Sequence, residues 1–258
     1  MFSDPQRAAL DRTLAACRDD ARIEALLGAG SLVTGGFDIH SDLDFVVVVR
    51  ADAHAALLGE AKAFAAGLGS LISAFTGEHV GEPRLLICLY GPPLVHVDLK
   101  FVTAADLDGA MERPRVLWAR DPAAMEQRAA TLSLKPGNHE AQWFEDRAWM
   151  WLHYSATKLL RGELFEALAA LDFFRETVLA PMLRRNAGER ARGLRRIEGL
   201  AGAREQLAPT VAGYDRAALE QAWRATVALY LELRAGDPPP LPAAHMPQAL
   251  LDFIDRGA

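Results

Sequence analysis

Two aspartates stand out in the sequence because their spacing suits a shared metal ion. Asp42 and Asp44 are separated by one residue and precede a run of four valines. On a strand, side chains two residues apart point to the same side, so both carboxylates enter one space while Leu43 and Phe45 enter the core. Neighbouring carboxylates repel each other unless a cation lies between them, and hard divalent ions take oxygen ligands. The pair predicts a Mg²⁺ site, in which Mn²⁺ can substitute.

Asp98 is the candidate for a third ligand. It occupies the polar side of a later alternating run, between Val97 and Leu99. If that run forms a strand beside the valine strand, opposed side chains are about 5 Å apart at Cβ. Three carboxylates at this spacing suit two metal ions about 3.5 to 4 Å apart, an arrangement that supports in-line phosphoryl chemistry.

A glycine–serine pair, Gly30 and Ser31, precedes the aspartates. Glycine lets a backbone approach a phosphate closely, and Ser31 offers a hydroxyl and an N–H at an expected helix start. Both residues are therefore expected to bind the phosphates of a nucleotide.

The segments GAGS, SDLDFVVVV and HVDLKFV together resemble the DNA polymerase beta-like nucleotidyltransferase superfamily. Its pattern is a Gly-Ser pair, a spaced Asp-x-Asp and a third acid on a following strand, and the resemblance covers residues 22–102. It implies a metal-dependent transfer of a nucleoside monophosphate, AMP from ATP, to a hydroxyl group with release of pyrophosphate. A helical second half of this size is also similar to the antibiotic adenylyltransferases of the superfamily, of the aminoglycoside or lincosamide type.

The resemblance implies further nucleotide contacts. A basic residue, and often a hydroxyl, from the helical domain of such enzymes reaches the triphosphate, and Lys158 and Tyr154 are the residues expected here. Lys100 shares the strand face of Asp98. It either neutralises phosphate charge or pairs with a carboxylate.

The catalytic base has several candidates. Asp98 can take the acceptor proton directly, whereas some antibiotic adenylyltransferases use a glutamate from the helical domain, which makes Glu140 and Glu145 alternatives. His96 also shares the face of Asp98. A strand histidine more often has a structural role, and that role is favoured for His96.

The elements that must position these residues indicate an α+β fold. In the first half, helical spacing of apolar residues indicates a helix from Ser3 to about Cys17, and an Ala-rich segment indicates a second helix over residues 53–68. Apolar runs indicate strands near residues 23–27, 43–49, 85–90 and 94–102. These elements form a small mixed sheet flanked by helices.

Long helical patterns dominate the second half. They cover residues 140–161, 163–186 and 215–233, with a short final helix near 247–255, and no strand is expected there. The sequence therefore predicts a mixed-sheet domain over residues 1–131 and a helical bundle over 132–258. The resemblance implies that the first is the catalytic nucleotidyltransferase domain and that the second completes the nucleotide and substrate site.

Composition narrows the choice of partner and location. A formal charge of -6 would repel a polyanion, so a long nucleic acid is disfavoured, and the arginines between Arg184 and Arg196 are expected to form a solvated helix end and loop. No signal-like or membrane-spanning run is found, which favours the cytoplasm and excludes a membrane partner. Cys17 and Cys88 fit buried thiols, and a homodimer is compatible with the sequence.

Several functions stay open at this stage. The favoured one is adenylylation of a small hydroxylated acceptor, and an acidic cleft would attract a cationic drug. The alternatives are transfer to a protein side chain or a tRNA end, and a non-catalytic nucleotide-binding or antitoxin-like protein. All three aspartates are present, which favours an enzyme. The acceptor, the nucleobase and the oligomeric state are left open.

Overall fold

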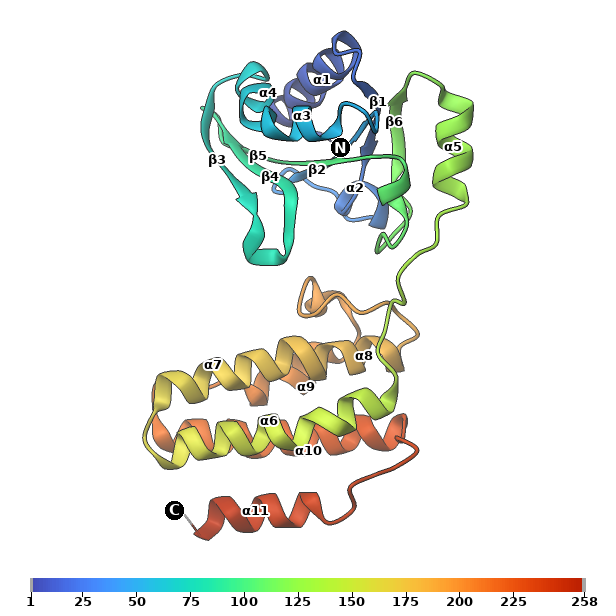
Figure 1. Ribbon diagram of the computed structural model, residues 1–258. Coiled ribbons are helices and arrows are strands. Elements are labelled where there is room, and N and C mark those ends of the chain that lie inside the picture. The colour runs from blue at the N-terminus through green and yellow to red at the C-terminus, as the bar shows by residue number, and fades with distance from the viewer. Residues whose placement is uncertain (1, 257–258) are drawn as a thin grey trace. The chain divides into compact units, whose positions relative to one another are not determined.

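A computed structural model describes residues 2–256 of the chain. The chain divides into two compact units, Met1–Lys135 and Pro136–Ala258. The first unit contains a six-stranded mixed sheet with helices on its faces, and the second is helical (Figure 1). The α+β fold class predicted from the sequence is thereby confirmed.

The sheet of the first unit has the strand order β3-β4-β5-β2-β1-β6. Its strands are β1 (Ile23–Gly28), β2 (Leu43–Val49), β3 (Leu71–Gly77), β4 (Glu82–Tyr90), β5 (Val95–Val102) and β6 (Arg115–Ala119). Strands β2 and β5 pair in parallel, and the other neighbours pair antiparallel. The central position of β2 and β5 places the aspartate-bearing segments side by side in the middle of the sheet.

The helices of this unit are short except for the first. They are α1 (Asp4–Asp19), α2 (Ser31–Thr34), α3 (His54–Gly59), α4 (Ala61–Gly67) and α5 (Pro122–Ala130), with 3-10 turns η1 (Glu78–Val80) and η2 (Ala105–Leu107). The single helix expected over residues 53–68 is wrong, because the chain breaks at Glu60, where ψ is 4°. Gly59 immediately precedes the break, and glycine is a poor helix former.

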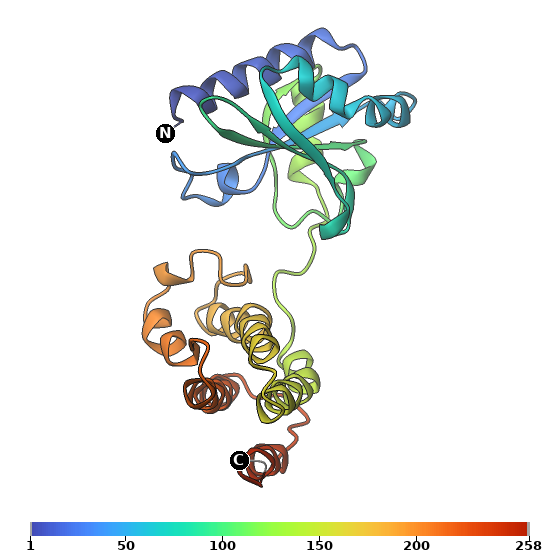
Figure 2. The same cartoon turned by 90° about the vertical axis from the view of Figure 1, so that its left-hand side faces the viewer.

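The two faces of the sheet have separate cores. The face that carries Leu43, Phe45 and Val47 packs against α1, α3 and α4 (Figure 2). On the opposite face, Val48 and Val102 pack with residues of η2, α5 and the segment after it. Asp44 precedes Val48 on that second face by four residues, so the aspartates lie beyond the end of this core.

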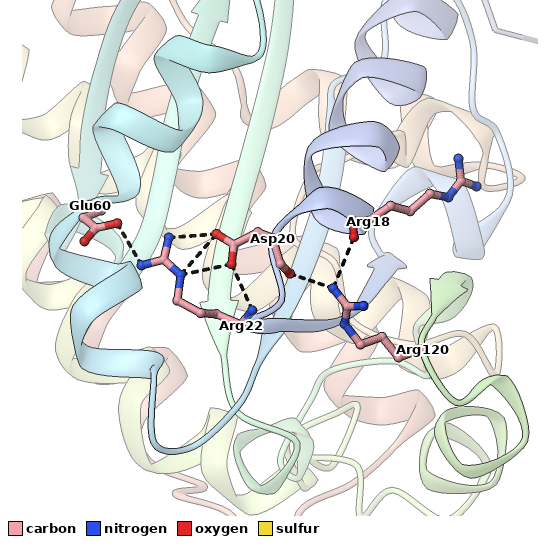
Figure 3. A network of polar contacts seen from close by, with 5 residues as sticks. All are labelled: Arg18, Asp20, Arg22, Glu60 and Arg120. Carbon is pink, nitrogen blue, oxygen red and sulfur yellow. Dashed lines mark hydrogen bonds and ion pairs between the residues drawn. The ribbon is translucent and has the colours of Figure 1, made fainter.

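A polar network ties the start of β1 to its neighbours (Figure 3). Arg22 donates hydrogen bonds to the Asp20 carboxylate at 2.7 Å and to Glu60 at 2.8 Å. Arg120 donates to the backbone carbonyls of Arg18 and Asp20. These contacts fix the turn between α1 and β1 against the start of α4 and the end of β6. The bond from Arg22 lowers the pKa of Asp20.

The second unit is built from helices around one core. Its elements are α6 (Ala141–Leu160), α7 (Leu164–Phe174), a π-helical turn η3 (Arg175–Leu179), α8 (Ala180–Asn186), η4 (Ile197–Gly199), α9 (Ala203–Leu207), η5 (Ala208–Thr210), α10 (Arg216–Gly236) and α11 (Met246–Arg256). The buried face of α6 includes Phe144, Ala148, Leu152 and Leu159, which recur at helical spacing. Among residues 2–256, no helix is long and apolar enough to cross a membrane.

The arginine-rich segment after α8 is less solvated than expected. The side chain of Arg184 is only 7% exposed, and it donates to Glu189 at 2.7 Å and to the carbonyl of Arg195 at 2.5 Å. Arg185 pairs with Asp237 and with Glu140. The expectation of a solvated cluster is therefore wrong for Arg184, which holds the following loop in place.

Candidate metal and nucleotide site

The parallel pairing of β2 with β5 sets Asp44 directly opposite Asp98. Asp42 lies one residue before β2 begins. One carboxylate oxygen from each of the three aspartates lies within 4.8 Å of the others, and all three residues are half-buried. The structure therefore brings together the three acids that the sequence singles out.

This donor set fits a hard divalent cation. It consists of carboxylate oxygens, the ligand type that Mg²⁺ and Mn²⁺ prefer. The cluster contains no thiol, and partial burial limits how much water can screen the charges. Asp42, Asp44 and Asp98 are the residues that would hold such ions.

Gly30 packs against the carboxylate of Asp44. It adopts φ +56°, and a Cβ at this position would lie 1.9 Å from Oδ2 of Asp44. The N–H of the preceding Ala29 donates to the Asp44 carbonyl at 2.9 Å. Glycine is required here both by its conformation and by the space, so the start of α2 is held against the aspartates.

Ser31 carries a buried hydroxyl beside this contact. Its Oγ has no hydrogen-bond partner among residues 2–256. A buried polar group left without a partner costs about 1–3 kcal/mol. A phosphate oxygen bound next to the aspartates would accept a hydrogen bond from this hydroxyl, so the position of Ser31 fits the phosphate-binding role expected for it.

His96 contacts the aspartate cluster directly. Its Nε2 lies 2.8 Å from Oδ1 of Asp98, and this hydrogen bond raises the pKa of His96. The histidine side chain is 46% exposed, whereas that of Asp98 is 17% exposed. His96 therefore orients one oxygen of Asp98. The sequence favoured a structural role for His96 and did not predict this contact.

Lys100 lies two residues beyond Asp98 on the same face of β5 and pairs with a carboxylate. Its Nζ is 2.7 Å from Glu82, which also accepts from Arg84 at 2.7 Å, and Arg84 lies 3.1 Å from Asp106. The bond from Arg84 and the further bond from Lys100 lower the pKa of Glu82 to about 2. The sequence prediction included Lys100 but missed Glu82 and Arg84. The sequence marks these two residues only as charges at the start of an apolar strand.

Lys158 and Tyr154 lie together on α6 in the second unit. Lys158 Nζ is 2.8 Å from Glu163, 3.1 Å from Glu166 and 5.0 Å from the centre of the Tyr154 ring. The Tyr154 hydroxyl donates to Glu166. The two glutamates raise the pKa of Lys158, and a phosphate would have to compete with them for this ammonium group.

Glu145 is a structural residue of the helical unit. Its side chain is 2% exposed, and it accepts hydrogen bonds from Trp149 Nε1 at 3.0 Å, Tyr230 Oη at 2.6 Å and Ala243 N at 2.7 Å. Arg234 pairs with it at 3.0 Å. A general base needs an oxygen that the acceptor can reach, so this environment argues against Glu145 as the base. Glu140, by contrast, has an 85% exposed side chain.

Comparison with known proteins adds one structural match. No family model matches the sequence, and no curated protein matches it. Among solved structures, the chain is similar to an aminoglycoside 6-adenyltransferase from Bacillus subtilis, with 15% sequence identity over 100% of this chain and 99% of that chain and a TM-score of 0.40. A likeness of this size carries no functional conclusion, so function is inferred below from the site itself.

Proposed function

We propose that the protein is a metal-dependent nucleotidyltransferase. It moves a nucleoside monophosphate from a nucleoside triphosphate, ATP by preference, to a hydroxyl group of a small acceptor. The observation that carries this proposal is the convergence of Asp42, Asp44 and Asp98 around one space, with Gly30 packed against Asp44. Neighbouring carboxylates repel one another and destabilise the folded chain unless a cation binds between them.

Different residues of the site are proposed to bind the phosphates and to accept the proton. Ser31 donates its unpartnered hydroxyl to a phosphate oxygen. Asp98, oriented by His96, accepts the proton of the acceptor hydroxyl. The acceptor oxygen then forms a bond to the α-phosphorus, and the bond from that phosphorus to the pyrophosphate oxygen breaks. Two Mg²⁺ ions bound to the aspartates would supply neutralisation of the triphosphate and a lower pKa for the attacking hydroxyl.

The helical unit supplies secondary candidates. Lys158 and Tyr154 are proposed to contact the triphosphate, with the ammonium group exchanging its glutamate partners for phosphate oxygens. Arginine and lysine side chains make charge-assisted bonds to phosphates that are about twice as strong as neutral ones. Such bonds would offset the loss of the pairs to Glu163 and Glu166.

The acceptor is proposed to be a small hydroxylated molecule. The similarity of the helical second half to antibiotic adenylyltransferases favours an antibiotic of the aminoglycoside or lincosamide type. The net charge of -6 supports a neutral or cationic acceptor over an RNA. Transfer to a protein side chain is the second candidate.

A ligand screen followed by an assay tests the function. The thermal midpoint of the full chain is measured with each nucleoside triphosphate, with Mg²⁺ and with EDTA. We expect ATP to raise the midpoint when Mg²⁺ is present and to have little effect in EDTA. Pyrophosphate release is then followed over a panel of aminoglycosides, lincosamides and RNA, with Asp44→Asn as the inactive control. Absence of Mg²⁺-dependent stabilisation by any triphosphate contradicts the proposal.

A further inference from the structure

A pocket of about 280 Å³ lies on the face of the sheet that carries Asp44 and Asp98. Val46 and Lys100, which both line it, form the register pair two residues beyond Asp44 and Asp98 on β2 and β5. Two residues along a strand span about 7 Å. A single small molecule can therefore extend from the aspartates into this pocket.

The pocket exists because the core on this face stops short of the aspartates. Val48 and Val102 are covered by η2 and α5, whereas Val46 is only partly buried. The segment from Asp106 to Pro114, together with Lys135, forms the wall. The volume lies just below the roughly 300–1,000 Å³ of pockets for drug-sized ligands, so the pocket suits one ring of a larger molecule.

Four of the lining residues form a chain of ion pairs that neutralises itself. The chain runs from Lys100 to Glu82, then to Arg84 and to Asp106, with distances of 2.7, 2.7 and 3.1 Å. These groups offer hydrogen-bond donors and acceptors to hydroxyl groups of a ligand but add no net charge.

Glu112 differs from the other charged residues of the pocket. It is half-buried, and within residues 2–256 it makes no hydrogen bond and no ion pair. The other acids of the lining are paired, because Glu82 and Asp106 belong to the chain of ion pairs and Asp108 pairs with Arg128 at 2.8 Å. A partly desolvated carboxylate without a counter-charge favours a ligand that brings one.

We propose that this pocket binds the part of the acceptor next to its reacting hydroxyl, and that Glu112 selects an acceptor with a protonated amine on that ring. That the bound molecule is the acceptor rests on the proposed function. The preference for an amine depends only on the residues of the pocket. The ammonium group donates charge-assisted hydrogen bonds to Glu112, while ring hydroxyls contact the ion-pair chain. An anionic ring is rejected because Glu112 would repel it.

Glucosamine and glucose are matched probes, because they differ by one amine on the same ring. Binding of each to the full chain is measured by NMR titration at neutral pH. We expect wild-type protein to bind glucosamine about tenfold more tightly than glucose, as one bond to a charged group implies. Glu112→Gln should remove the preference without lowering the thermal midpoint. Glu126→Gln, at an exposed position of α5 outside the pocket, should retain it.

Three outcomes overturn the inference: equal affinity for the two sugars, a preference that survives in Glu112→Gln, or no detectable binding of either sugar. Titration of the same samples with ATP and Mg²⁺ separates this failure from failure of the proposed function. If ATP binds with Mg²⁺ but the amine preference is absent, the pocket inference fails alone. If wild-type protein does not bind ATP, the proposed function fails, whatever the sugars do.

Discussion

No side chain larger than hydrogen fits between the backbone of Gly30 and the carboxylate of Asp44. A Cβ on Gly30 would lie 1.9 Å from Oδ2 of Asp44, well inside van der Waals contact. The glycine that we propose to lie against a phosphate thus also limits where the Asp44 carboxylate can lie. A change at Gly30 is therefore expected to affect both the aspartate cluster and the proposed phosphate contact.

Gly30→Ala should therefore disrupt the aspartate cluster. The added methyl group forces Asp44 or the start of α2 to move, and we expect the affinity for Mn²⁺ to fall by at least about tenfold, or about 1.4 kcal/mol. Electron paramagnetic resonance of free Mn²⁺ measures this change. Gly67→Ala is the control, because a Cβ there meets no atom within 4 Å. Equal Mn²⁺ affinity in the two variants would show that Asp44 does not bind the ion.

Asp44→Asn preserves the shape of the side chain and removes its charge. Loss of an anionic metal ligand should lower turnover by at least about a hundredfold, roughly 2.7 kcal/mol of transition-state stabilisation. The thermal midpoint should not fall, because repulsion among the carboxylates is relieved. Asp42→Asn and Asp98→Asn should behave alike. Near-native pyrophosphate release by Asp44→Asn with a confirmed acceptor would refute the assignment.

Lys158→Ala tests the contribution of the helical unit to nucleotide binding. If Lys158 contacts the triphosphate, the Kd for ATP with Mg²⁺, measured by calorimetry, should rise by about tenfold. Arg161→Ala is the matched control, since Arg161 is 62% exposed and lies 3.9 Å from the same Glu163. An unchanged Kd in Lys158→Ala removes this residue from the site.

Glu145→Gln tests the structural role of the buried carboxylate. The variant leaves Arg234, whose side chain is 14% exposed, without its counter-charge. Breaking a buried pair in this way costs about 3 kcal/mol of the free energy of unfolding. Urea denaturation followed by tryptophan fluorescence measures the loss. Glu140→Gln should change stability little because Glu140 is 85% exposed. A fully stable but inactive Glu145→Gln would instead restore Glu145 as a candidate base.

The ion-pair chain at Glu82 predicts a pH dependence of stability. Hydrogen bonds from Arg84 and Lys100 lower the pKa of Glu82 from 4.5 to about 2. A lowered pKa in the folded state stabilises the fold above pH 4.5, and this stabilisation is lost as the pH falls towards 2. The difference in thermal midpoint between wild type and Glu82→Gln should therefore be largest near neutral pH and should shrink below pH 4.5. A difference that is constant with pH would contradict the pairing.

The sequence predicted the middle of the sheet better than its edges. The strand that carries Asp98 alternates, and the strand that carries Asp44 ends in four valines, because neighbouring elements bury both strands. The edge strand β3 exposes Ile72 and Phe75, and β6 has only five residues, so neither shows a clear period. Helix α5 did have a local signal, since Asp121 caps it and Pro122 follows.

Local sequence patterns could not predict the pocket next to the aspartates. Glu82 and Lys100 meet because β4 and β5 pair antiparallel with Leu85 opposite Lys100, and Arg84 reaches Asp106 in a different segment. Contacts of this kind depend on register and on loop geometry. A hydrophobic period in the sequence encodes neither of them.

The parallel pairing of β2 with β5 also decides when the site can form during folding. Parallel neighbours cannot be joined by a tight turn, and here α3, α4 and the β3–β4 hairpin lie between them along the chain. The entropy of closing that long loop is lost before the strands meet. A nascent chain that ends before β5 carries Asp42 and Asp44 but not Asp98, so the cluster of three carboxylates forms only once β5 has paired with β2.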